Sequence, residues 1–142
     1  GAFNIVPERA ILSLEFRSLD PQQFEQLEVA LLRRAQVEAD RFGLGLEVEF
    51  LGKHEPAAMS QIAQQAIADA AMQLGLGTLA LSSRAGHDAQ IMAGLCTTGM
   101  IFVPSAGGAS HSAQEFTAWQ DCLNGANVLL HAALHLADRL AA

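Results

Sequence analysis

The chain has 142 residues, a length that suits one ordinary domain or two small parts of a larger one. Apolar side chains make up 51% of the sequence and are spread along it, which argues against wholesale disorder. The net charge of −7, with eight scattered basic residues, argues against a nucleic-acid partner. The sequence shows neither an apolar run of about eighteen residues nor a signal-peptide pattern. We therefore expect a soluble, cytoplasmic protein with no membrane partner.

The first 54 residues predict a strand, a helix and a second strand. Residues 12–16 and 46–50 alternate apolar with polar side chains, the pattern of half-buried strands. Between them, Asp20 and Pro21 suit the N-cap and the first position of a helix that ends at Gly43. This order is typical of half of a small α+β sandwich, in which a helix covers an antiparallel sheet.

Residues 55–142 predict a second part, after a polar passage that contains a proline. An alanine-rich helix is expected over residues 60–74, and the apolar run 100–104 has the composition of a strand buried on both faces. The last helix is expected to begin near Ser112, which with Glu115 fits a capping box. The whole chain is therefore assigned to the α/β class, with its second part the end of a layered α/β domain.

Two histidines stand out because each lies in a glycine-containing turn. His87 follows Gly86 and precedes an expected helix, and His111 lies in the turn after the buried strand. Sites in layered α/β domains form at the carboxyl ends of strands, and a neutral imidazole is a good zinc ligand. A single histidine in a turn is also common as a helix cap or a surface residue, so the residues alone leave both roles open.

Other polar residues have weaker claims to a site. Arg17 could grip a carboxylate with its forked guanidinium, helped by the amide of Asn4, although an arginine on a strand is usually only solvated. Asp88 and Glu115 could act as bases, or simply begin helices. His131 and His135 are four residues apart, but the acidic residue of an HExxH motif is absent, and we expect them on the flank of the last helix.

Three segments together resemble one enzyme family. Residues 4–20 (NIVPERAILSLEFRSLD) resemble its N-x-I-P and D-x-R segment, and residues 84–93 (RAGHDAQIMA) resemble its G-A-G-H-D-A segment. Residues 99–117 (GMIFVPSAGGASHSAQEFT) resemble the segment that supplies its last metal ligand. The family is the M20 group of metal-dependent amidohydrolases, which includes N-carbamoyl-L-amino-acid hydrolases and allantoate amidohydrolases.

The resemblance implies a hydrolase that cleaves a carbamoyl or ureido C–N bond by attack of a metal-bound hydroxide. It implies that residues 1–54 belong to a lid and dimerisation domain, and residues 55–142 to the catalytic zinc-hydrolase domain. The implied cofactor is a divalent metal in a dinuclear centre: zinc first, with manganese, cobalt or nickel as alternatives. The implied partners are a small substrate with a carboxylate and a carbamoyl group, and a second copy of the enzyme.

The resemblance also implies roles for single residues. His111 corresponds to a metal ligand, and His87 is implied to be catalytic through the developing oxyanion. Asn4, Arg17, Gly86 and His87 are implied to bind substrate, with Arg17 on the carboxylate.

The sequence departs from the family in two substitutions: Glu15 stands where the family usually has Asp, and Arg84 stands where a small residue is common. The family's His-x-Asp pair, Glu-Glu pair, further His and general-base Glu are absent from this chain. We therefore expect an incomplete fragment, inactive alone. An M20 aminopeptidase or dipeptidase relative and a non-catalytic α/β dimerisation module are the alternatives.

Overall fold

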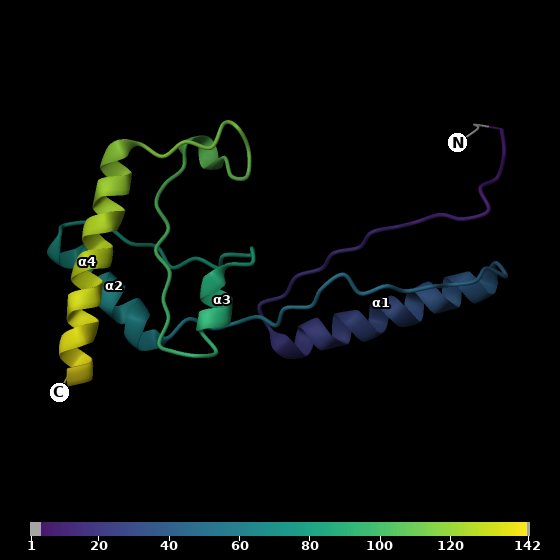
Figure 1. Cartoon of the computed structure of the whole chain (residues 1–142), viewed down its shortest axis with the longest axis horizontal. Coiled ribbons are helices and arrows are strands. Elements are labelled where there is room, and N and C mark those ends of the chain that lie inside the picture. Colours follow the sequence, from purple (N-terminus) through teal and green to yellow (C-terminus); the bar gives the residue numbers. More distant parts are fainter. Residues whose placement is uncertain (1–3, 142) are drawn as a thin grey trace. The chain divides into compact units, whose positions relative to one another are not determined.

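The computed structural model describes residues 4–141, and helices are its regular elements (Figure 1). In chain order they are α1 (Pro21–Arg41), α2 (Gln61–Gln73), α3 (Asp88–Met92), the 3₁₀ turn η1 (Ala106–Gly108) and α4 (Trp119–Ala141). The chain divides into two compact units, Gly1–Glu55 (unit 1) and Pro56–Ala142 (unit 2). No helix within the described residues is long and apolar enough to cross a membrane.

In unit 1, α1 begins as the sequence predicts. The carboxylate of Asp20 accepts hydrogen bonds from the backbone N–H groups of Gln22 at 2.9 Å and Gln23 at 3.4 Å. Pro21 lacks an N–H and therefore loses nothing at the first helical position. Gly43, with a φ of 66°, follows the last turn. The predicted N-cap and glycine end of this helix are confirmed.

Phe24 on α1 is the main packing point of unit 1. Its buried ring lies 5.0 Å from the ring of Phe16, and the Lys53 ammonium lies 5.6 Å from its centroid. The same ammonium pairs with Glu28 at 2.5 Å, and this hydrogen bond is the main reason that the pKa of Lys53 is raised. The extended segments on either side of α1 are thus tied to the helix by one aromatic ring and one lysine.

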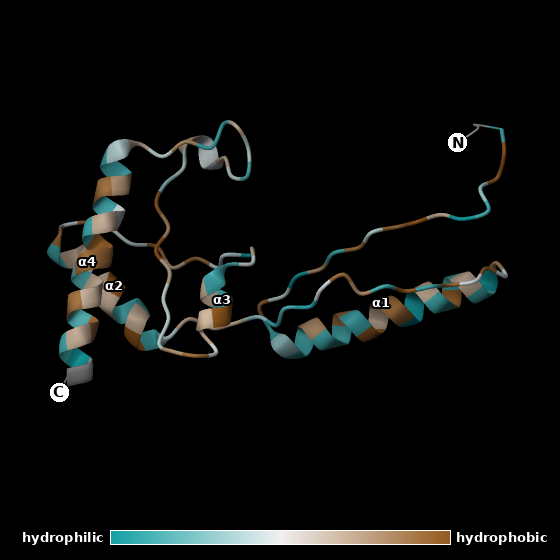
Figure 2. Ribbon diagram, viewed as in Figure 1, coloured by the Kyte–Doolittle hydropathy of each residue, from teal (hydrophilic) through white to brown (hydrophobic). Residues whose placement is uncertain are grey.

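The predicted strands are not present as strands among residues 4–141. Segments 12–16, 46–50 and 100–104 are extended but carry no ladder of strand hydrogen bonds. A strand needs a paired backbone neighbour, and an alternating sequence indicates only which side chains a sheet would bury. Leu12 is 92% exposed, and apolar residues recur along these extended stretches (Figure 2). The structure therefore shows the helical part of the α/β prediction and not its sheet.

In unit 2, α2 packs against α4 through small side chains. The buried cluster consists of Ala66, Ala70, Ala71, Val128 and Ala132. Short side chains let the two helix backbones approach closely, so the expected burial of the alanine-rich helix is confirmed. Ile67, Leu76, Ile101 and Leu136 cover the edge of this cluster.

The last helix begins later than the sequence predicts, at Trp119 instead of near Ser112. The capping box does not form, because the Glu115 carboxylate accepts a hydrogen bond from the backbone N–H of His111 at 2.8 Å. Residues 112–114 form a turn, and helical hydrogen bonds start only with those that Ala118 accepts from Asp121 and Cys122.

Candidate functional site

The loop from Ser105 to Phe116 carries His111 and is closed at its base. The backbone N–H of Ala106 donates to the carbonyl of Phe116 at 2.8 Å, which joins the two ends of the loop. The hydroxyl of Ser105 donates to the carbonyl of Ala109 at 2.6 Å. Loops whose ends meet and whose interior is hydrogen-bonded hold their side chains in defined places. This loop can therefore present a side chain in a fixed direction.

His111 is an exposed residue in the left-handed backbone region, with a φ of 53°. Non-glycine residues rarely adopt this region because Cβ crowds the backbone. Such outliers gather at functional sites, where the surrounding structure enforces them. Here Glu115 supplies part of that enforcement through its hydrogen bond to the His111 amide.

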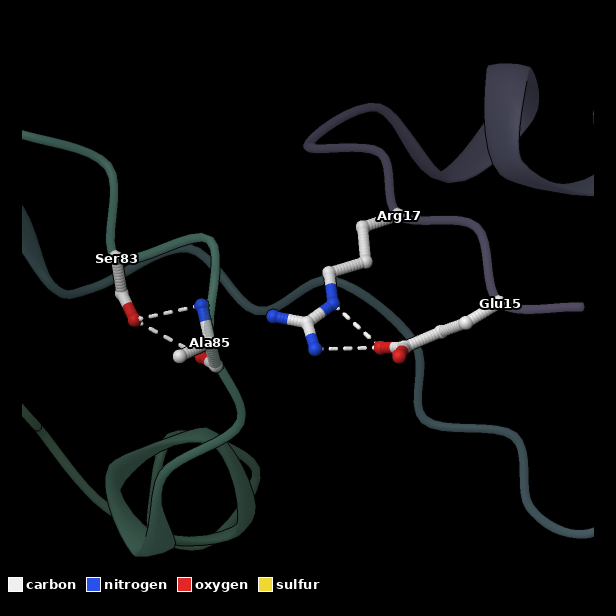
Figure 3. Close-up of polar contacts among 4 residues, drawn as sticks. All are labelled: Glu15, Arg17, Ser83 and Ala85. Carbon is white, nitrogen blue, oxygen red and sulfur yellow. Dashed lines mark hydrogen bonds and ion pairs between the residues drawn. The ribbon is translucent and has the colours of Figure 1, made fainter. Parts of the chain in front are cut away.

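A second loop leads to Gly86 and His87 and is built in a similar way. The Ser83 hydroxyl donates to the carbonyl of Ala85 at 2.9 Å and accepts from its N–H at 3.1 Å (Figure 3). Arg84, between them, is the other non-glycine residue with a positive φ among the described residues, at 56°. The roles of Ser83 and Ser105 were not predicted, although a serine hydroxyl that accepts from the N–H two residues on, as Ser83 does, is a known turn motif.

His87 is the N-cap residue of α3 and is exposed. Its ring lies edge-on to Phe102, with 5.8 Å between the centroids and 68° between the planes. Phe102 belongs to the predicted buried strand, so this contact ties the His87 loop to the segment that leads into the His111 loop. A Cβ added at Gly86 would lie 3.8 Å from the Gln90 side chain, an ordinary contact distance, so packing does not demand glycine there.

The two remaining candidates, Asn4 and Arg17, belong to unit 1. Asn4 is exposed in a turn. Arg17 Nε and Nη2 both lie 2.5 Å from one carboxylate oxygen of Glu15 (Figure 3). An exposed pair of this kind adds little stability. In this structure the pair sets the orientation in which the guanidinium lies.

The described residues do not form a metal centre. No group of three or more His, Cys, Asp or Glu side chains within residues 4–141 is arranged to hold a metal ion. A zinc site takes three or four protein ligands, and a dinuclear site takes more. Of the residues that the family resemblance selects in this chain, His111 alone corresponds to a metal ligand. The residues here do not fit a complete metal site.

His131 and His135 lie half-buried on α4. His135 is close enough to Asp69 on α2 for its charge to help lower the pKa of that carboxyl. This agrees with the expectation that both histidines occupy the flank of the last helix.

Several known proteins are similar to this chain. An N-carbamoyl-L-amino acid amidohydrolase of Geobacillus stearothermophilus is 37% identical over 138 residues, which cover 97% of this chain and 34% of that protein. A ureidoglycolate hydrolase of Arabidopsis thaliana is 30% identical over 130 residues, 91% of this chain and 27% of that protein. The chain spans about a third of the length of the curated relatives that it matches.

A solved structure from Burkholderia cenocepacia, provisionally described as an amidohydrolase/peptidase, superposes with a TM-score of 0.64 at 36% identity. The superposition covers 80% of this chain and 28% of that one. The model of the peptidase family M20/M25/M40 matches residues 3–135. A match over nearly the whole sequence, shared with these relatives, shows that the chain belongs to the peptidase family M20/M25/M40.

Proposed function

We propose that this chain is part of an amidohydrolase that cleaves the C–N bond of a carbamoyl or ureido group on a small carboxylate. The observation that carries the proposal is the 37% identity with an N-carbamoyl-L-amino acid amidohydrolase across 97% of the chain. The loops that hold His87 and His111 support it, because each contains an exposed histidine and a non-glycine residue with positive φ, which is Arg84 in the first loop and His111 itself in the second.

The proposed roles follow the position of each residue. Arg17, already oriented by Glu15, takes the substrate carboxylate, and this carboxylate has to compete with Glu15 for the guanidinium. Asn4 adds an amide donor to the same group. Gly86 and His87 line the carbonyl to be attacked, where an N–H donor from His87 stabilises the negative charge that develops on oxygen.

His111 is proposed as one ligand of a divalent metal, with zinc the first choice. Because the residues here do not make a complete site, we assign no reaction step to that metal. We further propose that residues 1–54 form part of a lid that pairs with a second copy, and residues 55–142 part of the catalytic domain. Segments 12–16, 46–50 and 100–104 would then become strands of an α/β fold where neighbouring strands pair with them.

Two other functions have an observation in their favour. The family description names peptidases, which favours an aminopeptidase or dipeptidase. The lack of a ligand cluster within residues 4–141 favours a non-catalytic dimerisation module, which would bind no metal on its own.

The deciding experiment measures hydrolysis of N-carbamoyl amino acids and of dipeptides by the full-length protein. We expect the carbamoyl substrates to be cleaved, and His87→Ala to lower kcat by about 100-fold, the usual cost of removing an oxyanion donor. His54→Ala, at an exposed histidine near the end of unit 1, is the matched control and should leave kcat unchanged. Faster cleavage of dipeptides would favour the peptidase, and cleavage of neither would favour the binding module.

A further inference from the structure

The carboxylate of Glu115 is held in place, yet it caps no helix. Its helix-capping role is excluded because α4 begins at Trp119, four residues later. The backbone N–H of Glu115 donates to the carbonyl of Ser112 at 3.1 Å, which folds residues 112–115 into a turn. This turn directs the Glu115 side chain back along the chain to the amide of His111, 2.8 Å away.

This hydrogen bond is made to His111, the non-glycine residue of the loop that adopts a positive φ. A carboxylate that accepts from a backbone N–H makes a charge-assisted bond, stronger than a neutral one. At His111 it locks the peptide plane that precedes Cα while φ is 53°. Because Glu115 follows His111 in the chain, the ring that this hydrogen bond closes contains the N–Cα bond of His111 and restricts rotation about φ, and with it the direction in which Cβ leaves the backbone.

Other contacts hold the two ends of the loop that carries this hydrogen bond. Ser105 and Ala106 close the two ends of the loop through Ala109 and Phe116. Val103, two residues before Ser105, lies so close to Gly125 of α4 that a Cβ there would overlap its side chain. The segment that leads into the His111 loop is therefore packed against α4.

We propose that Glu115 is the positioning residue of His111: its carboxylate, through the His111 amide, holds the backbone in the left-handed conformation that aims the imidazole. This proposal rests on the proposed function, because aiming matters only if the His111 imidazole acts in the site. Side chains that must act together need their supporting residues to hold them within about 0.5 Å of the working position.

Three substitutions of Glu115 distinguish the effect of side-chain length from the effect of charge and from removal of the whole carboxylate. Glu115→Gln keeps the length of the side chain and an acceptor oxygen, without the charge. Glu115→Asp keeps the charge but is one methylene too short to reach. Glu115→Ala removes the charge and the acceptor oxygens together. Asp138→Ala on α4 is the matched control, since it also removes one exposed carboxylate of unit 2.

The first measurement is the ¹⁵N–¹H spectrum of the full-length protein labelled on histidine, with the His111 signal identified by its loss in His111→Asn. We expect Glu115→Ala and Glu115→Asp to move the His111 amide proton upfield and to remove its protection from exchange. Glu115→Gln should keep most of both, and Asp138→Ala should change neither. An unchanged His111 signal in Glu115→Ala, or an aspartate variant that resembles wild type more closely than the glutamine variant, overturns the proposal.

The second measurement is the steady-state kinetics of the same variants on an N-carbamoyl amino acid. Loss of a residue that orients a reacting group lowers kcat by about 10- to 100-fold while KM changes little. We expect that loss in the alanine and aspartate variants and its recovery in the glutamine variant. Full activity in His111→Asn would refute the proposed role of His111 in the reaction, and the spectrum would still decide whether Glu115 fixes its backbone.

Discussion

Asp69 joins the two packed helices of unit 2 through its carboxylate. One oxygen accepts from Gln65 on the same helix at 2.8 Å, and the other accepts from Arg139 of α4 at 2.8 Å. The hydrogen bond from Gln65 is the largest cause that lowers the pKa of Asp69 below the ordinary 3.8, and the Arg139 bond and charge, with the charge of His135, add to it. The ionised form is therefore the one that the folded state favours.

The lowered pKa predicts how the stability of unit 2 depends on pH. Since the folded pKa of Asp69 lies below 3.8, its contribution is present above that pH and is lost as the pH falls through the folded pKa. Urea unfolding should show wild type more stable than Asp69→Asn at pH 6, with the difference shrinking below pH 3.8. A difference that persists unchanged at low pH would contradict this prediction.

Single residues also show what a sequence can and cannot specify. The Asp20 cap was predictable because its partners, Gln22 and Gln23, are its immediate neighbours. The role of Glu115 was not, because a glutamate after Ser112 can serve either a helix cap or the amide of His111, and the choice depends on where α4 begins. The sequence marked both histidine turns by their glycines, and Gly107 and Gly108 do adopt positive φ values, but Arg84 and His111 adopt them as well.

At the level of elements, α4 carries a glycine where the chain crosses it closely. A Cβ on Gly125 would overlap Cγ1 of Val103, so the extended segment 100–104 can lie against α4 only because residue 125 has no side chain. Glycine inside a helix costs about 1 kcal/mol relative to alanine. This loss of helix stability accompanies the close contact between Val103 and α4 at Gly125.

We therefore predict that Gly125→Ala destabilises unit 2. The gain in helix propensity, about 1 kcal/mol, opposes an overpacking cost of about 1–3 kcal/mol, and the overlap with Val103 places the cost at its upper end. The double variant Gly125→Ala/Val103→Ala should recover stability relative to Gly125→Ala alone. Urea unfolding of the four proteins gives the coupling directly. Additive single effects would show that the contact does not limit packing.

The sheet was the part of the fold that local sequence could not supply. Residues 12–16 and 46–50 alternate correctly, but alternation specifies faces and not partners. Helices α1 and α2 satisfy their own backbone hydrogen bonds, so their patterns translated directly into structure. A strand depends on a second segment, and in the described residues that pairing is absent.

For the molecule as a whole, the balance between buried and exposed apolar side chains is unusual. The buried apolar residues within the described part are Phe24, Val128 and six alanines. Large apolar side chains are instead open to solvent, among them Val6 at 90%, Leu12 at 92% and Leu51 at 85%. Exposed apolar surface together with unpaired extended backbone favours association with other chains.

We predict that these 142 residues, produced alone, self-associate. Sedimentation velocity over a concentration series should show a mass that rises with concentration. Leu12→Ser/Leu14→Ser, which makes one exposed extended segment polar, should weaken the association, whereas Asp138→Ala should not. A strictly monomeric profile at high concentration would contradict the prediction.

The start of α4 at Trp119 has a practical optical consequence. The chain contains one tryptophan and no tyrosine, so its intrinsic fluorescence comes from a single point three residues after the His111 loop ends. That indole is 80% exposed and emits as a solvated fluorophore. A polypeptide that covers this end of α4 will shift the emission to the blue, so the chain reports its own association without a label.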